Sequence, residues 1–90
     1  MAEEEKAFQR VMGCVPTRVI VESLKSGEKS FEDLNEELNK LSPDGVDSIV
    51  VRLYITQLKI NGFVEEKQKE GREYFNLTDK WKMLESKMKT

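Results

Sequence analysis

The side chains of this 90-residue sequence that could do chemistry are cations and hydrogen-bond donors, and they gather in one part of the chain. Arg52 and Gln57 lie in a stretch with helical apolar spacing, and Lys67, Lys69 and Arg72 follow in a charged, polar stretch. Such side chains donate hydrogen bonds to base edges and to phosphate oxygens. The chemistry that these residues predict is therefore binding of a partner.

Catalytic and metal chemistry have almost no support. Cys14 is the only cysteine and the sequence contains no histidine, so the ligands of a zinc site are not available. The sequence suggests no catalytic nucleophile paired with a general base, and it contains no glycine-rich phosphate loop. We therefore expect no enzyme, no metal and no cofactor, and Cys14 is expected to be a small core side chain.

Composition indicates a globular protein, with 36% charged and 38% hydrophobic residues. Its length fits a single domain over residues 1–90, with an N-terminal helix in 1–15, a core in 16–78 and a C-terminal helix in 79–90. The net charge is −2 and the pI is about 5.3. A protein that grips DNA by charge alone should be basic, so a nucleic-acid site must be a local patch.

Targeting signals are not evident. No apolar run reaches the roughly 20 residues that span a bilayer, and the acidic start, MAEEEK, argues against a signal peptide. A single cysteine fits a reducing compartment. These features predict a cytoplasmic protein without membrane contact.

Apolar periodicity and turn residues predict a mainly α protein with a small β-hairpin. We expect helices over residues 3–12, 17–27, 30–41, 46–61 and 80–88, strands over 63–66 and 73–77, and a short third strand within 27–30. Ser30 and Asp33 have the spacing of a capping box. Gly62 suits a left-handed helix end because it lacks a Cβ, and Gly71 lies near the hairpin tip.

In this order, the residues resemble winged helix-turn-helix transcription regulators of the arsenic-repressor, MarR and PadR type. Four segments carry the resemblance: Pro16 to Leu24 (PTRVIVESL), Ser30 to Leu34 (SFEDL), Leu58 to Val64 (LKINGFV) and Glu70 to Thr78 (EGREYFNLT). It covers roughly residues 16–79. The chain departs from these regulators in a longer segment over 39–47, in lacking metal-sensing cysteines and histidines, and in an unusually apolar third core helix.

The resemblance implies that this third core helix enters the DNA major groove and that the hairpin, or wing, flanks it. The implied DNA-binding residues are Ser48, Arg52, Tyr54, Thr56, Gln57 and Lys59 on the helix and Lys67, Lys69 and Arg72 on the wing. Arg52 could pair with guanine and Gln57 with adenine, and Val50 or Leu53 could touch a thymine methyl group. In the alternative interpretation, Arg52 is a solvated flank charge and the apolar far side packs on another element or chain.

Acidic residues beside the predicted DNA-binding residues should counteract binding to DNA. Glu65, Glu66, Glu70 and Glu73 alternate with the wing cations and should flatten the salt dependence of DNA binding. The helix that starts at Ser30 also carries several carboxylates, which we interpret as a solvated face.

The two ends of the chain predict pairing of two copies. A helix as short as 79–88 is not stable alone, and Trp81, Leu84 and Met88 follow a seam spacing. The resemblance implies dimerisation through terminal helices, with Phe8 completing the interface. The alternative is that Trp81 completes the core of one copy.

The predicted function is sequence-specific binding of double-stranded DNA by a homodimeric transcription regulator. The alternative is a winged helix that serves as a protein-interaction module within a larger assembly.

Overall fold

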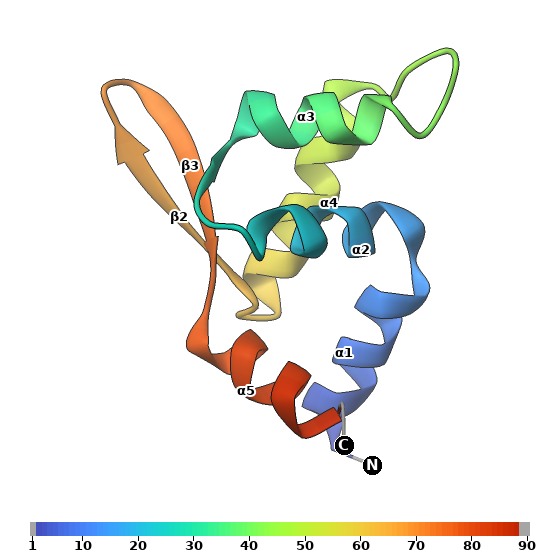
Figure 1. Ribbon diagram of the computed structural model, residues 1–90, viewed down its shortest axis with the longest axis vertical. Coiled ribbons are helices and arrows are strands. Elements are labelled where there is room, and N and C mark those ends of the chain that lie inside the picture. Colours follow the sequence, from blue (N-terminus) through green and yellow to red (C-terminus); the bar gives the residue numbers. More distant parts are fainter. Residues whose placement is uncertain (1, 89–90) are drawn as a thin grey trace.

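The computed structural model describes residues 2–88, which form five helices and a three-stranded antiparallel sheet (Figure 1). The elements are α1 (Glu3–Gly13), α2 (Val15–Leu24), β1 (Lys29–Ser30), α3 (Phe31–Asn39), α4 (Ser48–Ile60), β2 (Val64–Lys69), β3 (Arg72–Leu77) and α5 (Asp79–Met88). The strand order is β1-β3-β2. The predicted winged helix-turn-helix fold is confirmed, including the short third strand and the helix at each end.

The helices and the hairpin divide the molecule into three parts. Helices α2, α3 and α4 pack together, and the β2–β3 hairpin projects along one side of them (Figure 1). Helices α1 and α5 pack against each other at the end of the molecule away from α3 (Figure 1). None of the helices in residues 2–88 is long and apolar enough to cross a membrane.

Ser30 joins the sheet to α3. Its Oγ accepts a hydrogen bond from the Asp33 amide at 3.1 Å, and the Asp33 carboxylate accepts one from the Ser30 amide at 3.4 Å. This confirms the predicted capping box. Because Ser30 also pairs with Tyr74 in the sheet, α3 begins directly at the edge of the wing.

Helix α3 ends at Asn39, two residues before the predicted end at Leu41. The amides of Lys40 and Leu41 donate to carbonyls three residues earlier, which tightens the last turn. The Asn39 side chain then accepts a hydrogen bond from the Val46 amide at 2.8 Å, so it organises the loop before α4. Helix α2 likewise ends at Leu24, before the predicted Gly27.

Helix α4 presents Val51, Ile55 and Leu58 to the core, as the periodicity predicts. Gly62 ends it with a φ of 78°, in the left-handed region that favours glycine. The following Phe63 donates its amide to the Leu58 carbonyl, so β2 begins at Val64 instead of the predicted residue 63.

The hairpin is longer than predicted, because its loop has only two residues. Glu70 and Gly71 both have positive φ, at 50° and 77°, as in the primed turns that match strand twist. Strand pairing therefore extends to Lys69 and Arg72 at the tip.

Trp81 lies at the centre of the packing between α1 and α5. Its side chain is fully buried, its ring stacks on Phe8 at 4.6 Å between centroids, and it meets the edge of Phe63 at 5.2 Å. One indole thus connects both terminal helices to the start of the wing.

We expect Trp81→Ala to lower the free energy of unfolding by about 3–5 kcal/mol, because it empties a closely packed aromatic site. Met83→Ala is the matched control, since Met83 lies on the same helix and is 72% exposed. Urea unfolding followed by circular dichroism measures both. Equal stability of the two variants would contradict this account of the core.

Candidate nucleic-acid interface

The predicted DNA-binding residues lie on two neighbouring elements, α4 and the β2–β3 hairpin. All of them are exposed except Tyr54, which is half-buried. Tyr54 and Gln57 lie on the flank of α4 toward α1 and α2, where they line a shallow groove with Cys14 and Thr17. The structure therefore separates these two residues from the wing side of α4.

The strand register places the cations of the wing on one face, which they share with Glu65. Residues directly opposite each other in an antiparallel pair share a face. Lys67 lies opposite Tyr74 and Lys69 opposite Arg72, so the three wing cations share one face.

The other face of the wing carries carboxylates. Glu66 lies opposite Phe75, and Glu73 lies opposite Gln68. Phe75 is buried, so this face is the one turned toward the helices. Glu66 and Glu73 therefore point to α4.

Arg52 is held between three elements. Its Nη1 lies 2.8 Å from Oε2 of Glu73 on β3, and its guanidinium carbon lies 4.1 Å from the ring centroid of Phe31 on α3. The hydrogen bond to Glu73 raises the pKa of Arg52. Arg52 is thus bound to the wing rather than being an isolated flank charge, and its contact with DNA stays a prediction.

Lys59 makes the second contact between α4 and the wing. Its Nζ lies 2.5 Å from Oε1 of Glu66, whose other oxygen accepts a hydrogen bond from Gln68 at 2.8 Å. The bond from Lys59 is the main cause that lowers the pKa of Glu66. The wing and α4 are therefore joined by two ion pairs.

A third cation is also paired. Nζ of Lys69 lies 2.7 Å from Oε2 of Glu28, and the other oxygen of Glu28 accepts a hydrogen bond from Asn76. These contacts, first the one with Lys69, lower the pKa of Glu28. Lys67 and Arg72 make no ion pair within residues 2–88, so they are the wing cations available to a partner.

The outward face of α4 is apolar. Ile49, Leu53 and Ile60 are 69%, 64% and 73% exposed, and Val50 is also exposed. Val46, which the helical spacing also placed on this side, instead precedes α4 and packs partly against the core. Thr56 and Gln57 supply the polar groups on or beside the exposed ridge.

Three of the residues predicted to pair two copies lie inside one copy. Phe8, Trp81 and Leu84 are buried in the core, and Met88 is half-buried against it. This burial agrees with the alternative in which Trp81 completes the core, and a role in dimerisation stays a prediction. The exposed apolar side chain of α5 is Met83, which lines a groove with Glu4, Lys80 and Lys87.

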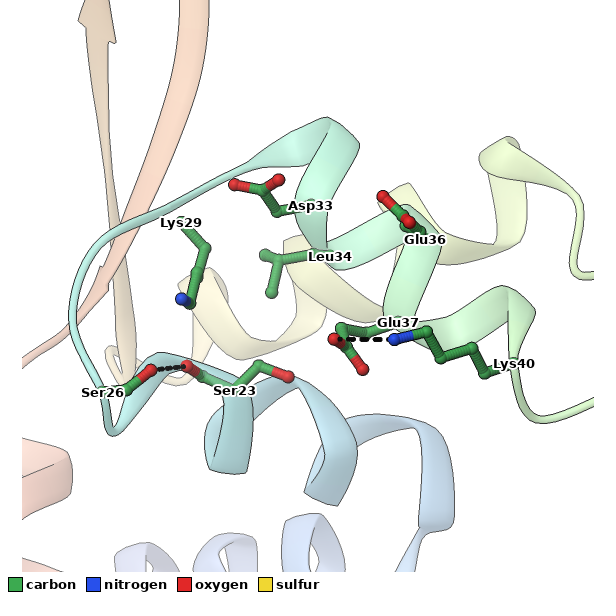
Figure 2. A pocket seen from close by; sticks show the side chains of 8 residues that line it. All are labelled: Ser23, Ser26, Lys29, Asp33, Leu34, Glu36, Glu37 and Lys40. Carbon is green, nitrogen blue, oxygen red and sulfur yellow. Dashed lines mark hydrogen bonds and ion pairs between the residues drawn. The ribbon is translucent and has the colours of Figure 1, made fainter.

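The hollow between α2 and α3, of about 320 Å³, offers no catalytic arrangement. Figure 2 shows that its lining is polar and internally bonded: Lys40 pairs with Glu37 at 3.3 Å and Ser26 donates to the Ser23 carbonyl. Asp33 on its rim belongs to the capping box. Among residues 2–88, no cluster of three or more histidine, cysteine or acidic side chains could hold a metal ion.

Sequence reasoning missed that Glu28, Glu66 and Glu73 are the partners of the candidate cations. For Glu66 and Glu73 the signal is the alternation of acidic and basic residues along the wing, which by itself predicts only a flatter salt dependence of DNA binding.

We expect the Lys59–Glu66 pair to stabilise the protein by a few tenths of a kcal/mol near neutral pH, as exposed pairs do. The pKa of Glu66 is lowered from its ordinary 4.5 in the folded chain, so this stabilisation exists above that value and is lost as the pH falls below it. Glu66→Gln should therefore cost stability at neutral pH and cost nothing near pH 3, by urea unfolding at each pH.

Glu65→Gln is the control for this measurement, because Glu65 lies on the same strand with its side chain on the other face. If the cost of Glu66→Gln is the same at both pH values, the pair does not form in solution.

Comparison with known proteins supports the fold. No protein-family model matches the sequence, and no curated protein matches it. Among solved structures, HlyU from Vibrio cholerae is 17% identical with a TM-score of 0.71, and the alignment covers 98% of this chain and 96% of HlyU. The transcriptional repressor BigR from Xylella fastidiosa is 14% identical with a TM-score of 0.69, covering 96% and 92%.

A third solved structure is the homodimeric winged helix-turn-helix DNA-binding domain of Mb0332 from Mycobacterium bovis. It is 15% identical with a TM-score of 0.68, and the alignment covers 98% of this chain and 84% of that domain. At these identities the comparisons establish the fold of this chain: a winged helix-turn-helix of the kind found in ArsR-family regulators.

Proposed function

We propose that this protein is a transcription regulator that binds double-stranded DNA. Helix α4 enters the major groove, and the β2–β3 hairpin lies along the backbone and the adjacent minor groove. The observation that carries the proposal is the exposed face of α4 beside a hairpin on which Lys67 and Arg72 have no ion-pair partner in residues 2–88. Structural neighbours that are described as a transcriptional regulator, a transcriptional repressor and a DNA-binding domain support it.

The proposed roles follow the position of each side chain. Ser48, Thr56 and Gln57 contact base edges from the exposed part of α4, with Tyr54 at its flank. Lys67, Lys69 and Arg72 contact phosphates. Arg52 and Lys59 lie where α4 meets the wing, so they reach the backbone at the edge of the groove.

The functional unit that we propose is a cytoplasmic homodimer of single-domain chains. The described homodimer of Mb0332 supports pairing, and we propose that it occurs through α1 and α5, which form one end of the molecule (Figure 1). A two-fold dimer places two α4 helices in successive major grooves, so the target is a near-palindrome with half-sites about one helical turn apart.

A second candidate function is binding of a protein partner through α4. The exposure of Ile49, Leu53 and Ile60 favours it, because contiguous exposed apolar side chains mark interaction sites. A DNA-reading helix would more commonly present polar side chains there.

We expect the purified protein to bind random-sequence duplex DNA in a salt-sensitive manner, measured by fluorescence anisotropy at several salt concentrations. Arg72→Ala and Lys67→Ala should each weaken binding and reduce the slope of log affinity against log salt by about 0.9, because each removes one phosphate contact. Arg52→Ala should also weaken binding.

Lys6→Ala is the matched control, since Lys6 is an exposed lysine on α1, away from the hairpin. Binding that is equal for the control and for the wing variants would contradict the wing contacts. Absence of binding at low salt by every form would reject the DNA proposal and direct the search to a protein partner of the apolar ridge.

A further inference from the structure

Two cations of α4 already have anionic partners on the hairpin of their own chain. Arg52 contacts Glu73 at 2.8 Å and Lys59 contacts Glu66 at 2.5 Å. Both carboxylates come from the hairpin face that turns toward α4, and both cations come from the flank of α4 that turns toward the hairpin. Two ion pairs therefore join α4 to the hairpin, with both cations on α4 and both carboxylates on the hairpin.

In both pairs the cation is the more accessible partner. The side chain of Arg52 is 50% exposed against 29% for Glu73, and that of Lys59 is 40% exposed against 22% for Glu66. A partner that arrives from solvent can therefore reach the cations without first displacing the hairpin. Ion pairs this exposed are also weak enough to be exchanged.

Carboxylates and phosphates compete for the same donors. Both present oxygen atoms that accept charge-assisted hydrogen bonds from guanidinium and ammonium groups. At the edge of a major groove occupied by α4, the anions nearest to this junction are backbone phosphates.

We propose that Glu66 and Glu73 are positioning residues that occupy the phosphate-binding groups of this site in the free protein. They orient Lys59 and Arg52 along the junction between α4 and the wing, and DNA phosphates replace them when the complex forms. This inference rests on the proposed DNA binding and specifies which residues set its affinity and its salt dependence.

The exchange has a thermodynamic consequence. A free lysine or arginine that neutralises a phosphate releases a counterion condensed on the DNA, and this release makes binding salt-dependent. When the cation comes from an ion pair, the carboxylate that it leaves regains a counterion of its own. The two effects oppose each other, so Arg52 and Lys59 contribute little to the salt dependence of the wild-type protein.

A purely structural role for the two pairs is the competing explanation. In that case they tie the hairpin to α4 in the free and in the bound protein, and their removal changes stability but not the salt dependence of binding. The slope of log affinity against log salt therefore separates the two explanations.

The test compares Glu66→Gln, Glu73→Gln and the double variant with wild type and with Glu65→Gln. Glutamine keeps the size and a hydrogen-bond acceptor but removes the charge. Glu65→Gln makes the same change of charge on the same strand, on the face turned away from α4, at a residue without an ion-pair partner in residues 2–88. Anisotropy titrations with one random-sequence duplex over a salt series give affinity and slope.

We expect each substitution at Glu66 or Glu73 to raise low-salt affinity roughly three- to tenfold and to steepen the slope by about 0.9, with the double variant near the sum. Glu65→Gln removes a carboxylate without freeing a cation, so we expect it to change affinity and slope less than either of these substitutions, and its effect measures the contribution of local charge alone. Thermal unfolding by circular dichroism verifies that every variant is folded at the titration temperature.

Slopes of the Glu66 and Glu73 variants that match Glu65→Gln would overturn this inference and leave the proposed DNA binding intact. Binding by the double variant alone would support both proposals, because the carboxylates would then mask the site completely. Absence of binding by every form, the double variant included, would reject both.

Discussion

The turn at Asn61–Phe63 fixes where the hairpin lies relative to α4, and the candidate interface depends on it. Gly62 ends the helix with a φ of 78°, and its carbonyl accepts a hydrogen bond from the Thr78 hydroxyl at 2.6 Å. The Phe63 carbonyl accepts another from the Thr78 amide, so the end of β3 is bound to the end of α4. A Cβ on Gly62 would lie 3.4 Å from atoms of the Lys80 side chain, and the positive φ would strain any other residue. These contacts hold the hairpin along the flank of α4 that carries Arg52 and Lys59.

This geometry explains how an acidic protein can carry exposed cations on one face of its wing. The net charge is −2, so the chain has more carboxylates than cations, and several of these carboxylates belong to the hairpin itself. The alternation along β2 and β3 sends Glu66 and Glu73 inward to α4 and leaves Lys67 and Arg72 on the other face. Net charge describes the whole chain, whereas a partner meets only one face of the wing.

The apolar character of α4 has two separate causes in the structure. Val51, Ile55 and Leu58 form its buried side and hold it in the core. Ile49, Leu53 and Ile60 lie on the opposite side and are covered by nothing in residues 2–88. A single helix thus carries both the contacts that stabilise the fold and an exposed apolar surface, so substitutions on its two sides should affect different properties.

The sequence by itself determined the elements and their boundaries wherever local interactions decide them. Three local features can be read from the spacing of residues in the chain: the capping box of Ser30 and Asp33, the glycines at the end of α4 and in the hairpin turn (Gly62 and Gly71), and the buried face of α4. Each depends on residues within a few positions of one another. The tertiary structure alone decided which charges meet. Arg52 and Glu73 are 21 positions apart and Lys69 and Glu28 are 41 apart, and only the register of the hairpin and the docking of α4 bring them together. It also decided the burial of Trp81, because a short amphipathic helix has the same pattern whether it covers its own core or a second copy.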